Sequence, residues 1–165
     1  MSKSSSAKDA ATSAADLRTG LWERPGFLIR RLHQIHVALF LEESREFDVT
    51  PVQYALMTTL LLTPGLDQIS LARDAGVDRT NVADVLQRLE QRGILTREVS
   101  DHDRRVKLAY LTQDGEDLTR RMEEAVLVAQ DRFVAPLKKT ERAELNRLLT
   151  ALVDANNDLS RAPIR

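Results

Sequence analysis

The chain has 165 residues, with 24 lysines and arginines against 25 aspartates and glutamates, a net charge of −1 at pH 7. Its length predicts one compact domain with helical extensions, and 42% hydrophobic with 30% charged residues indicates a soluble globular protein. The absence of cysteine excludes disulfides, thiolate chemistry and cysteine-ligated zinc. No apolar run approaches the ~20 residues of a membrane span, so we expect no membrane partner and a cytoplasmic location.

The first twenty residues lack the apolar core of a secretory signal, so we expect residues 1–20 to be a disordered tail and residues 21–165 to fold. The folded part opens with "RPGFLIRRLHQIHVALFLEESREF", whose apolar residues predict a helix. Those at helical spacing are Leu28, Leu32, Ile35 and Leu39. Further apolar side chains widen the stripe, which predicts packing against more than one partner.

The second predicted helix carries its start and stop signals in the sequence. Thr50 is the expected N-cap, Pro51 takes the first helical position, and Gln53 follows three residues after the cap. Pro64 and Gly65 mark the end of this helix.

Two shorter helical segments come next. The first covers about residues 68–75 and stops at Gly76, which suits a left-handed C-terminal cap. Asp78 then caps a longer helix that ends at Gly93. The expected buried stripe of that helix is Val82, Val85, Leu86 and Leu89. Two helices joined by a tight glycine-containing turn form a helix-turn-helix pattern.

The remaining segments predict a hairpin and two C-terminal helices. "ILTREV" and "VKLAYL" read as strands on either side of "SDHDRR", and the second strand alternates Val106, Leu108 and Tyr110. Thr112 is the expected cap of a long helix that ends near Pro136. A last helix in "TERAELNRLLTALVDANNDL" presents a leucine stripe. The hairpin directly follows the helix-turn-helix, which is where a DNA-binding wing would stand.

The helix after Asp78 has the polar outer face of a recognition helix, whose first residues reach base edges in the major groove. Arginine suits guanine, asparagine or glutamine suits adenine, and a threonine methyl group suits thymine. An exposed face with an ordinary polar mixture is the alternative. The DNA-contact candidates on this helix are Arg79, Thr80, Asn81, Asp84 and Arg88, with Arg79 expected on phosphate.

The hairpin turn adds three cations within four residues, Arg104, Arg105 and Lys107. Such an arm can follow the phosphates or insert an arginine into a narrow minor groove. Asp101 and Asp103 are expected to brace the turn or to pair with one of the arginines. Arginines on exposed turns are often merely solvated, so the wing interpretation depends on the helices that precede it.

The run from Asp78 to Gly115 resembles the winged-helix core of MarR-type transcriptional regulators. The matching motifs stand at Leu89–Gly93, Asp103–Arg105 and Leu111–Gly115. The resemblance implies a mainly α fold, a winged helix-turn-helix with a small β-hairpin wing and with N- and C-terminal dimerisation helices. The winged lobe is expected at about residues 50–112, and the dimerisation helices at about 21–47 and 113–160.

The resemblance also implies a homodimer that represses transcription from a pseudo-palindromic operator until a small aromatic acid releases it. The apolar stripes within Phe27–Leu41 and Leu145–Leu159 favour a dimer independently, because they are more than a small winged-helix core can cover. In this family the effector pocket lies between the dimerisation helices and the winged lobe. The candidates there are Trp22, Arg30, Arg31, His33, His36, Tyr54 and Met57. Each has an ordinary alternative as a core, solvated or salt-bridged residue. The segment from Trp22 to Phe40 also resembles regulators of aromatic-acid breakdown, including nicotinate degradation.

Other functions find little support in the sequence. His33 and His36 share a helix face, but a zinc site needs three or four ligands and this chain offers no cysteine, so we expect no metal and no cofactor. The motifs of hydrolases, nucleotide-binding proteins and zinc proteases are absent, so we expect that this protein is not an enzyme. Two alternatives stay open: a helical dimerisation or adaptor module that binds protein, and a repressor without an effector.

Overall fold

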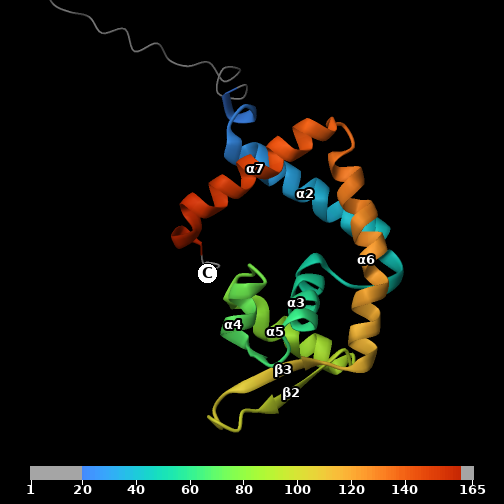
Figure 1. Cartoon of the computed structure of the whole chain (residues 1–165), viewed down its shortest axis with the longest axis vertical. Coiled ribbons are helices and arrows are strands. Elements are labelled where there is room, and N and C mark those ends of the chain that lie inside the picture. The colour runs from blue at the N-terminus through green and yellow to red at the C-terminus, as the bar shows by residue number, and fades with distance from the viewer. Residues whose placement is uncertain (1–19, 161–165) are drawn as a thin grey trace, which may run out of the picture. The chain divides into compact units, whose positions relative to one another are not determined.

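The computed structural model describes residues 20–160, which fall into two units that divide between Ile35 and His36. Helices predominate, and the strands form one small sheet (Figure 1). The helices are α2 (Pro25–Glu43), α3 (Pro51–Leu62), α4 (Gln68–Asp74), α5 (Arg79–Gln91), α6 (Gln113–Val134) and α7 (Lys139–Asn156). The strands are β1 (Leu66–Asp67), β2 (Leu95–Val99) and β3 (Lys107–Leu111). Short 3-10 turns cover Arg45–Phe47 and Asn157–Leu159. Within residues 20–160, none of the helices combines the length and hydrophobicity that crossing a bilayer requires.

The start signal of α3 forms the predicted capping box. The Gln53 backbone N–H donates to the Thr50 hydroxyl at 3.3 Å, and the Gln53 side chain accepts from the Thr50 N–H at 2.8 Å. Pro51 occupies the first turn. Two of the backbone donors that a helix start leaves unpaired are therefore satisfied locally.

The turn glycines also behave as the sequence predicts. Gly76 follows α4 with φ of 64°, and Gly93 follows α5 with φ of 70°. Glycine adopts this left-handed conformation without the clash that a Cβ would cause. The tight turn after α4 leads directly into α5, which completes the helix-turn-helix.

The sheet contains one strand more than predicted. Strands β2 and β3 pair antiparallel as the expected hairpin, and the two-residue β1 adds to the free edge of β3, giving the order β1-β3-β2. The alternation expected along β3 is wrong in phase: the buried residue is Ala109, whereas Leu108 and Tyr110 are only half-buried. A small side chain at Ala109 lets the sheet lie close to the helices.

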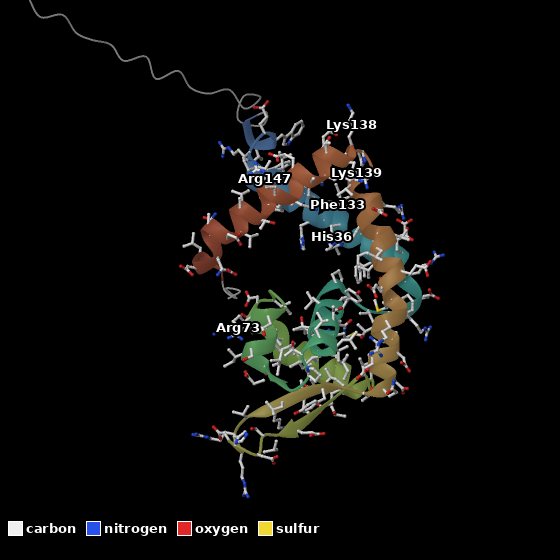
Figure 2. The ribbon with its side chains drawn as sticks, in the orientation of Figure 1. His36, Arg73, Phe133, Lys138, Lys139 and Arg147 are labelled. Carbon is white, nitrogen blue, oxygen red and sulfur yellow. The ribbon has the colours of Figure 1, made fainter. Side chains whose placement is uncertain are left out.

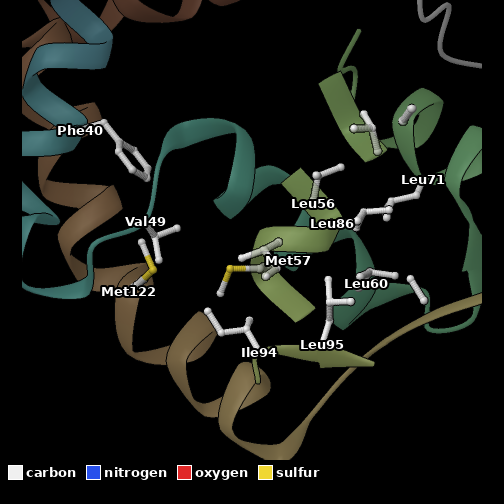
Figure 3. Close-up of a cluster of buried hydrophobic side chains, with 14 residues drawn as sticks. Phe40, Val49, Leu56, Met57, Leu60, Leu71, Leu86, Ile94, Leu95 and Met122 are labelled. Carbon is white, nitrogen blue, oxygen red and sulfur yellow. The ribbon is translucent and has the colours of Figure 1, made fainter. Parts of the chain in front are cut away.

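The hydrophobic core joins the helix-turn-helix to α6 and the sheet (Figure 3). Leu71 of α4, Leu86 of α5 and Leu95 of β2 are each at most 1% exposed, and Met122 brings α6 into the same cluster. The mainly helical winged helix-turn-helix fold predicted from the sequence is confirmed. This core holds the recognition helix and the hairpin in one lobe.

The two C-terminal helices end close to where the sequence predicts. α6 stops at Val134, before Pro136, as expected. α7 stops at Asn156, whereas its leucine stripe predicts helix as far as Leu159. The Asn156 side chain donates to the Leu152 carbonyl at 2.8 Å. Asparagine competes in this way for backbone groups, which disfavours further α-helix, and a 3-10 turn over Asn157–Leu159 follows instead.

Candidate nucleic-acid interface

The recognition helix α5 presents its polar residues outward because its apolar residues are fixed in the core. Val82, Leu86 and Leu89 are at most 1% exposed. The opposite face carries exposed polar side chains: Arg79, Thr80, Asp84, Gln87 and Arg88. Asn81 belongs to α5, but its side chain lies outside the described part of the structure. The arrangement leaves a continuous face that can enter a major groove.

The cap of α5 orders the start of this face. The Asp78 carboxylate accepts from the Thr80 N–H at 3.0 Å and from the Thr80 hydroxyl at 2.8 Å, both through the same oxygen. This bond satisfies one of the free N–H groups at the helix start and fixes the first exposed turn.

The hairpin closes on a turn whose cations are all exposed. The Ser100 N–H donates to the Val106 carbonyl at 2.9 Å, and the Val106 N–H donates back to the Asp103 carbonyl at 2.9 Å. Between these bonds, Arg104 and Arg105 lie in solvent, and Lys107 begins β3 with its side chain exposed. The turn therefore projects positive charge from the end of the sheet, as a wing would.

Asp103 braces the turn, as the sequence predicts, and binds only one of the two arginines. Its carboxylate accepts from the Arg105 N–H at 3.0 Å and from the Arg105 guanidinium at 3.2 and 3.4 Å. The backbone N–H of Arg105 lowers the pKa of Asp103, and the guanidinium lowers it further. Arg105 stays 91% exposed. Arg104 makes no hydrogen bond or ion pair with any residue of 20–160, and neither does Asp101.

The base of the wing is tied to the recognition helix by an ion pair that sequence reasoning missed. The Arg97 guanidinium of β2 donates to the Glu90 carboxylate of α5, with Nε at 2.9 Å. This contact lowers the pKa of Glu90. The side chains are 22% and 37% exposed, so water screens the pair only partly. Arg97 therefore orients the hairpin and is not free to bind phosphate.

A second missed contact anchors the end of α5 to the segment between α2 and α3. The Arg92 guanidinium donates to the Asp48 carbonyl at 2.6 Å and to the Phe47 carbonyl at 3.2 Å. Asp48 has φ of 50°, an unusual conformation for a residue with a side chain. The Arg121 guanidinium of α6 lies 5.7 Å from the centroid of the Phe47 ring. Arginines of two helices thus hold this linker in place.

Three effector candidates gather in the first unit. Trp22, Arg30 and Arg31 line an open depression of about 630 Å³ together with apolar residues of α2. The Arg30 guanidinium lies 5.2 Å from the centroid of the Phe27 ring. His33 is exposed and lies outside this lining.

The other effector candidates belong to the second unit and have ordinary packing partners. The rings of His36 and Phe133 (Figure 2) meet edge to face, with their centroids 5.7 Å apart. The Nε2 atom of His36 lies 3.0 Å from the Gln130 amide nitrogen. Tyr54 is half-buried with its ring 5.9 Å from that of Phe40. Met57 is fully buried in the core. Within residues 20–160, no three histidines, aspartates or glutamates gather closely enough to hold a metal ion.

Comparison with known proteins identifies the family to which this interface belongs. The sequence pattern described as the MarR family matches residues 49–107, which contain the helix-turn-helix and most of the hairpin. A Thauera aromatica protein named for transcriptional regulation of the hcr operon is 34% identical over 131 residues, 77% of each chain. The PcaV transcriptional regulator of Streptomyces coelicolor, solved in complex with its natural ligand, is 34% identical. That match covers 82% of this chain and 95% of PcaV, with a TM-score of 0.73.

A further solved relative is the BpsR protein of Bordetella bronchiseptica, whose structure concerns the regulation of its DNA binding by 6-hydroxynicotinic acid. It is 27% identical, with 81% of this chain and 95% of BpsR covered, and the TM-score is 0.77. Sequence pattern, relatives and fold all agree. This chain belongs to the MarR family of DNA-binding transcriptional regulators.

Proposed function

We propose that the protein is a repressor that binds a pseudo-palindromic operator as a homodimer and leaves it when a small aromatic acid binds. The observation that carries this proposal is the joint geometry of α5 and the hairpin. A polar helix face and a projecting turn with Arg104 and Arg105 belong to one lobe, tied together by the Arg97–Glu90 pair. A recognition helix in the major groove with a basic arm beside it uses both surfaces at once.

The exposed leucines of α7 support the homodimer. No residue of this helix is buried, and Leu148, Leu149 and Leu152 are each more than 40% exposed. Helix α2 likewise exposes Leu28 and Leu32. A second copy that covers these faces would remove apolar surface from water, and a two-fold dimer would place its recognition helices ~10 bp apart on the operator.

The depression beside Trp22 supports the aromatic acid. Arg30 and Arg31 can bind a carboxylate, and the indole ring of Trp22 offers an apolar face for an aromatic ring. The effect of 6-hydroxynicotinic acid on the DNA binding of the relative BpsR shows which compounds to test first. The other candidates, His33, His36, Tyr54 and Met57, stay proposals for effector contacts, because none of them lines this depression.

The test is fluorescence anisotropy of the full chain on DNA from upstream of its own gene, against a random duplex, at several salt concentrations. We expect selective binding whose logarithm falls steeply and linearly with the logarithm of salt concentration, because phosphate contacts release counterions. Arg104→Ala and Arg105→Ala should each weaken binding with little change in melting temperature, because both side chains are exposed. Arg120→Ala removes one equal charge from α6 and is the matched control.

The effector is tested by titrating 6-hydroxynicotinic acid and other aromatic carboxylates into the protein–DNA complex, with the corresponding amides as controls. Release by an acid but not by its amide would support the carboxylate site. Undiminished binding in both wing variants would refute the wing assignment. Equal and salt-independent signals on both duplexes would refute DNA binding and favour a protein-binding module.

A further inference from the structure

The hydroxyl group of Thr80, on the second residue of the recognition helix, is already engaged within the protein. It donates to the Asp78 carboxylate at 2.8 Å. The same carboxylate oxygen accepts from the Thr80 backbone N–H at 3.0 Å, so one cap atom holds the residue at two points. A hydroxyl group has a single hydrogen to donate, and in Thr80 that hydrogen is donated to Asp78.

This bond also fixes the methyl group of Thr80. The hydroxyl and the methyl share one Cβ and occupy staggered positions about 120° apart, so the orientation of one determines the other. Thr80 is exposed, and its position in the first turn of α5 is one from which side chains reach base edges. With the hydroxyl hydrogen donated to the cap, the hydroxyl can no longer donate to a base, and the methyl group is the part of this side chain left for an apolar contact.

We infer that Thr80 is a specificity-determining residue that reads the C5-methyl group of a thymine in each half-site, and that Asp78 is its positioning residue. In the major groove the thymine methyl is the one apolar group that distinguishes base pairs, and an apolar side-chain group suits it. A free threonine hydroxyl could instead donate to several bases, which would make the contact promiscuous. The inference rests on the proposed operator binding by α5.

The experiment begins with the full-length protein and a library of duplexes randomised over 30 base pairs. The tightest selected duplex is then remade with each thymine in turn replaced by deoxyuridine, which keeps the base pairing and removes only the methyl group. Binding is compared for the wild type, Thr80→Ser, Thr80→Val and Asp78→Ala. Serine keeps the hydroxyl and loses the methyl, whereas valine keeps the methyl and loses the hydroxyl.

At one thymine in each half-site, deoxyuridine should weaken binding of the wild type about fourfold, the factor expected for burial of one methyl group. Thr80→Val should keep this ratio, because valine carries a methyl group on both branches of Cβ and holds one rotamer in a helix without a cap bond, whereas threonine without its cap bond divides between two. Thr80→Ser should reduce the ratio to about one. Asp78→Ala should also lower the ratio, which a general loss of helix stability would not do.

A duplex set with no uridine-sensitive thymine would overturn the inference while leaving operator binding intact. Equal sensitivity in Thr80→Ser would overturn it as well, because the methyl would then be read by another residue. Failure to select any duplex would instead refute the proposed function, and this inference with it.

Discussion

Replacing Gly115 by alanine should destabilise the whole winged lobe, because there is no room for a methyl group at this position. Gly115 is buried in the first turn of α6, where that helix starts beside β2. A Cβ built there lies 2.0 Å from the Ile94 carbonyl oxygen and 3.0 Å from the carbonyl carbon. These are backbone atoms, which cannot swing aside as a flexible side chain could.

The same Ile94 carbonyl and its neighbour at Gly93 accept the hydrogen bonds that hold the start of α6 to the sheet. The Thr112 N–H donates to the Ile94 oxygen at 3.0 Å, and the Thr112 hydroxyl donates to the Gly93 carbonyl at 2.7 Å while it caps the Gly115 N–H at 3.1 Å. Moving the helix away would break this group of bonds.

Overpacking at Gly115 costs about 1–3 kcal/mol. A buried carbonyl left unpaired adds about 1–3 kcal/mol. Alanine recovers about 1 kcal/mol of helix propensity. The net loss should be about 3 kcal/mol of the about 5–15 kcal/mol that stabilises a typical domain.

Urea unfolding followed by circular dichroism measures this loss, with all proteins at one concentration because dimer formation would add to the apparent stability. Gly26→Ala is the matched control, since a Cβ at Gly26 in α2 meets nothing within 4 Å. The control should equal the wild type or exceed it by up to about 1 kcal/mol. A Gly115→Ala protein as stable as the wild type would show that α6 can shift freely against β2 and would refute the reasoning.

Three further predictions concern the linker and the wing. Asp48→Gly should raise the unfolding free energy by about 0.5 kcal/mol, because glycine adopts φ of 50° without the Cβ penalty; a lower unfolding free energy would contradict this. Arg92→Lys should lower the unfolding free energy by about 1 kcal/mol, because an ammonium cannot bridge two carbonyls as the guanidinium does, and unchanged stability would count against the bridge. The pKa of the Asp103 carboxyl should lie below its usual range. Its ion pair and hydrogen bonds with Arg105 are therefore fully formed at neutral pH and are lost as the pH falls through the lowered pKa. Carbon NMR follows this titration, and Arg105→Ala should restore the pKa only in part, since the backbone N–H remains; titration at or above the usual value would contradict the brace.

Local chemistry explains why much of this fold can be predicted from the sequence. The capping box of Thr50 and Gln53 and the left-handed glycines after α4 and α5 depend on residues within a few positions of one another. The strand β1 could not be predicted in this way, because two residues carry no alternation and form a strand only by pairing with β3. The burial of Ala109 between larger neighbours depends likewise on what the helices place against the sheet.

In the candidate interface, too, local features can be predicted from the sequence and long-range contacts cannot. The period of α5 predicts which of its residues face outward, and the short span from Asp103 to Arg105 predicts the brace of the wing. The contacts that orient these surfaces are different. Arg92 meets a carbonyl 44 residues earlier in the chain, and the partner of Arg97 lies on another element. An arginine that orients the site and one that binds DNA look alike in the sequence, and only the folded chain separates them.

The chain has a net charge of −1, so free carboxylates near the interface would repel the phosphates of DNA. Three acids near the interface are engaged with the protein itself: Asp78 caps α5, Asp103 holds Arg105, and Glu90 holds Arg97. The carboxylate of Asp84 differs from these three: it is exposed on the recognition face and, like that of Asp101 in the wing turn, makes no hydrogen bond or ion pair with residues 20–160. A carboxylate beside phosphates would be repelled, whereas one facing base edges can accept from the amino group of cytosine. The same charge that weakens general affinity for DNA can therefore contribute to choosing among sequences.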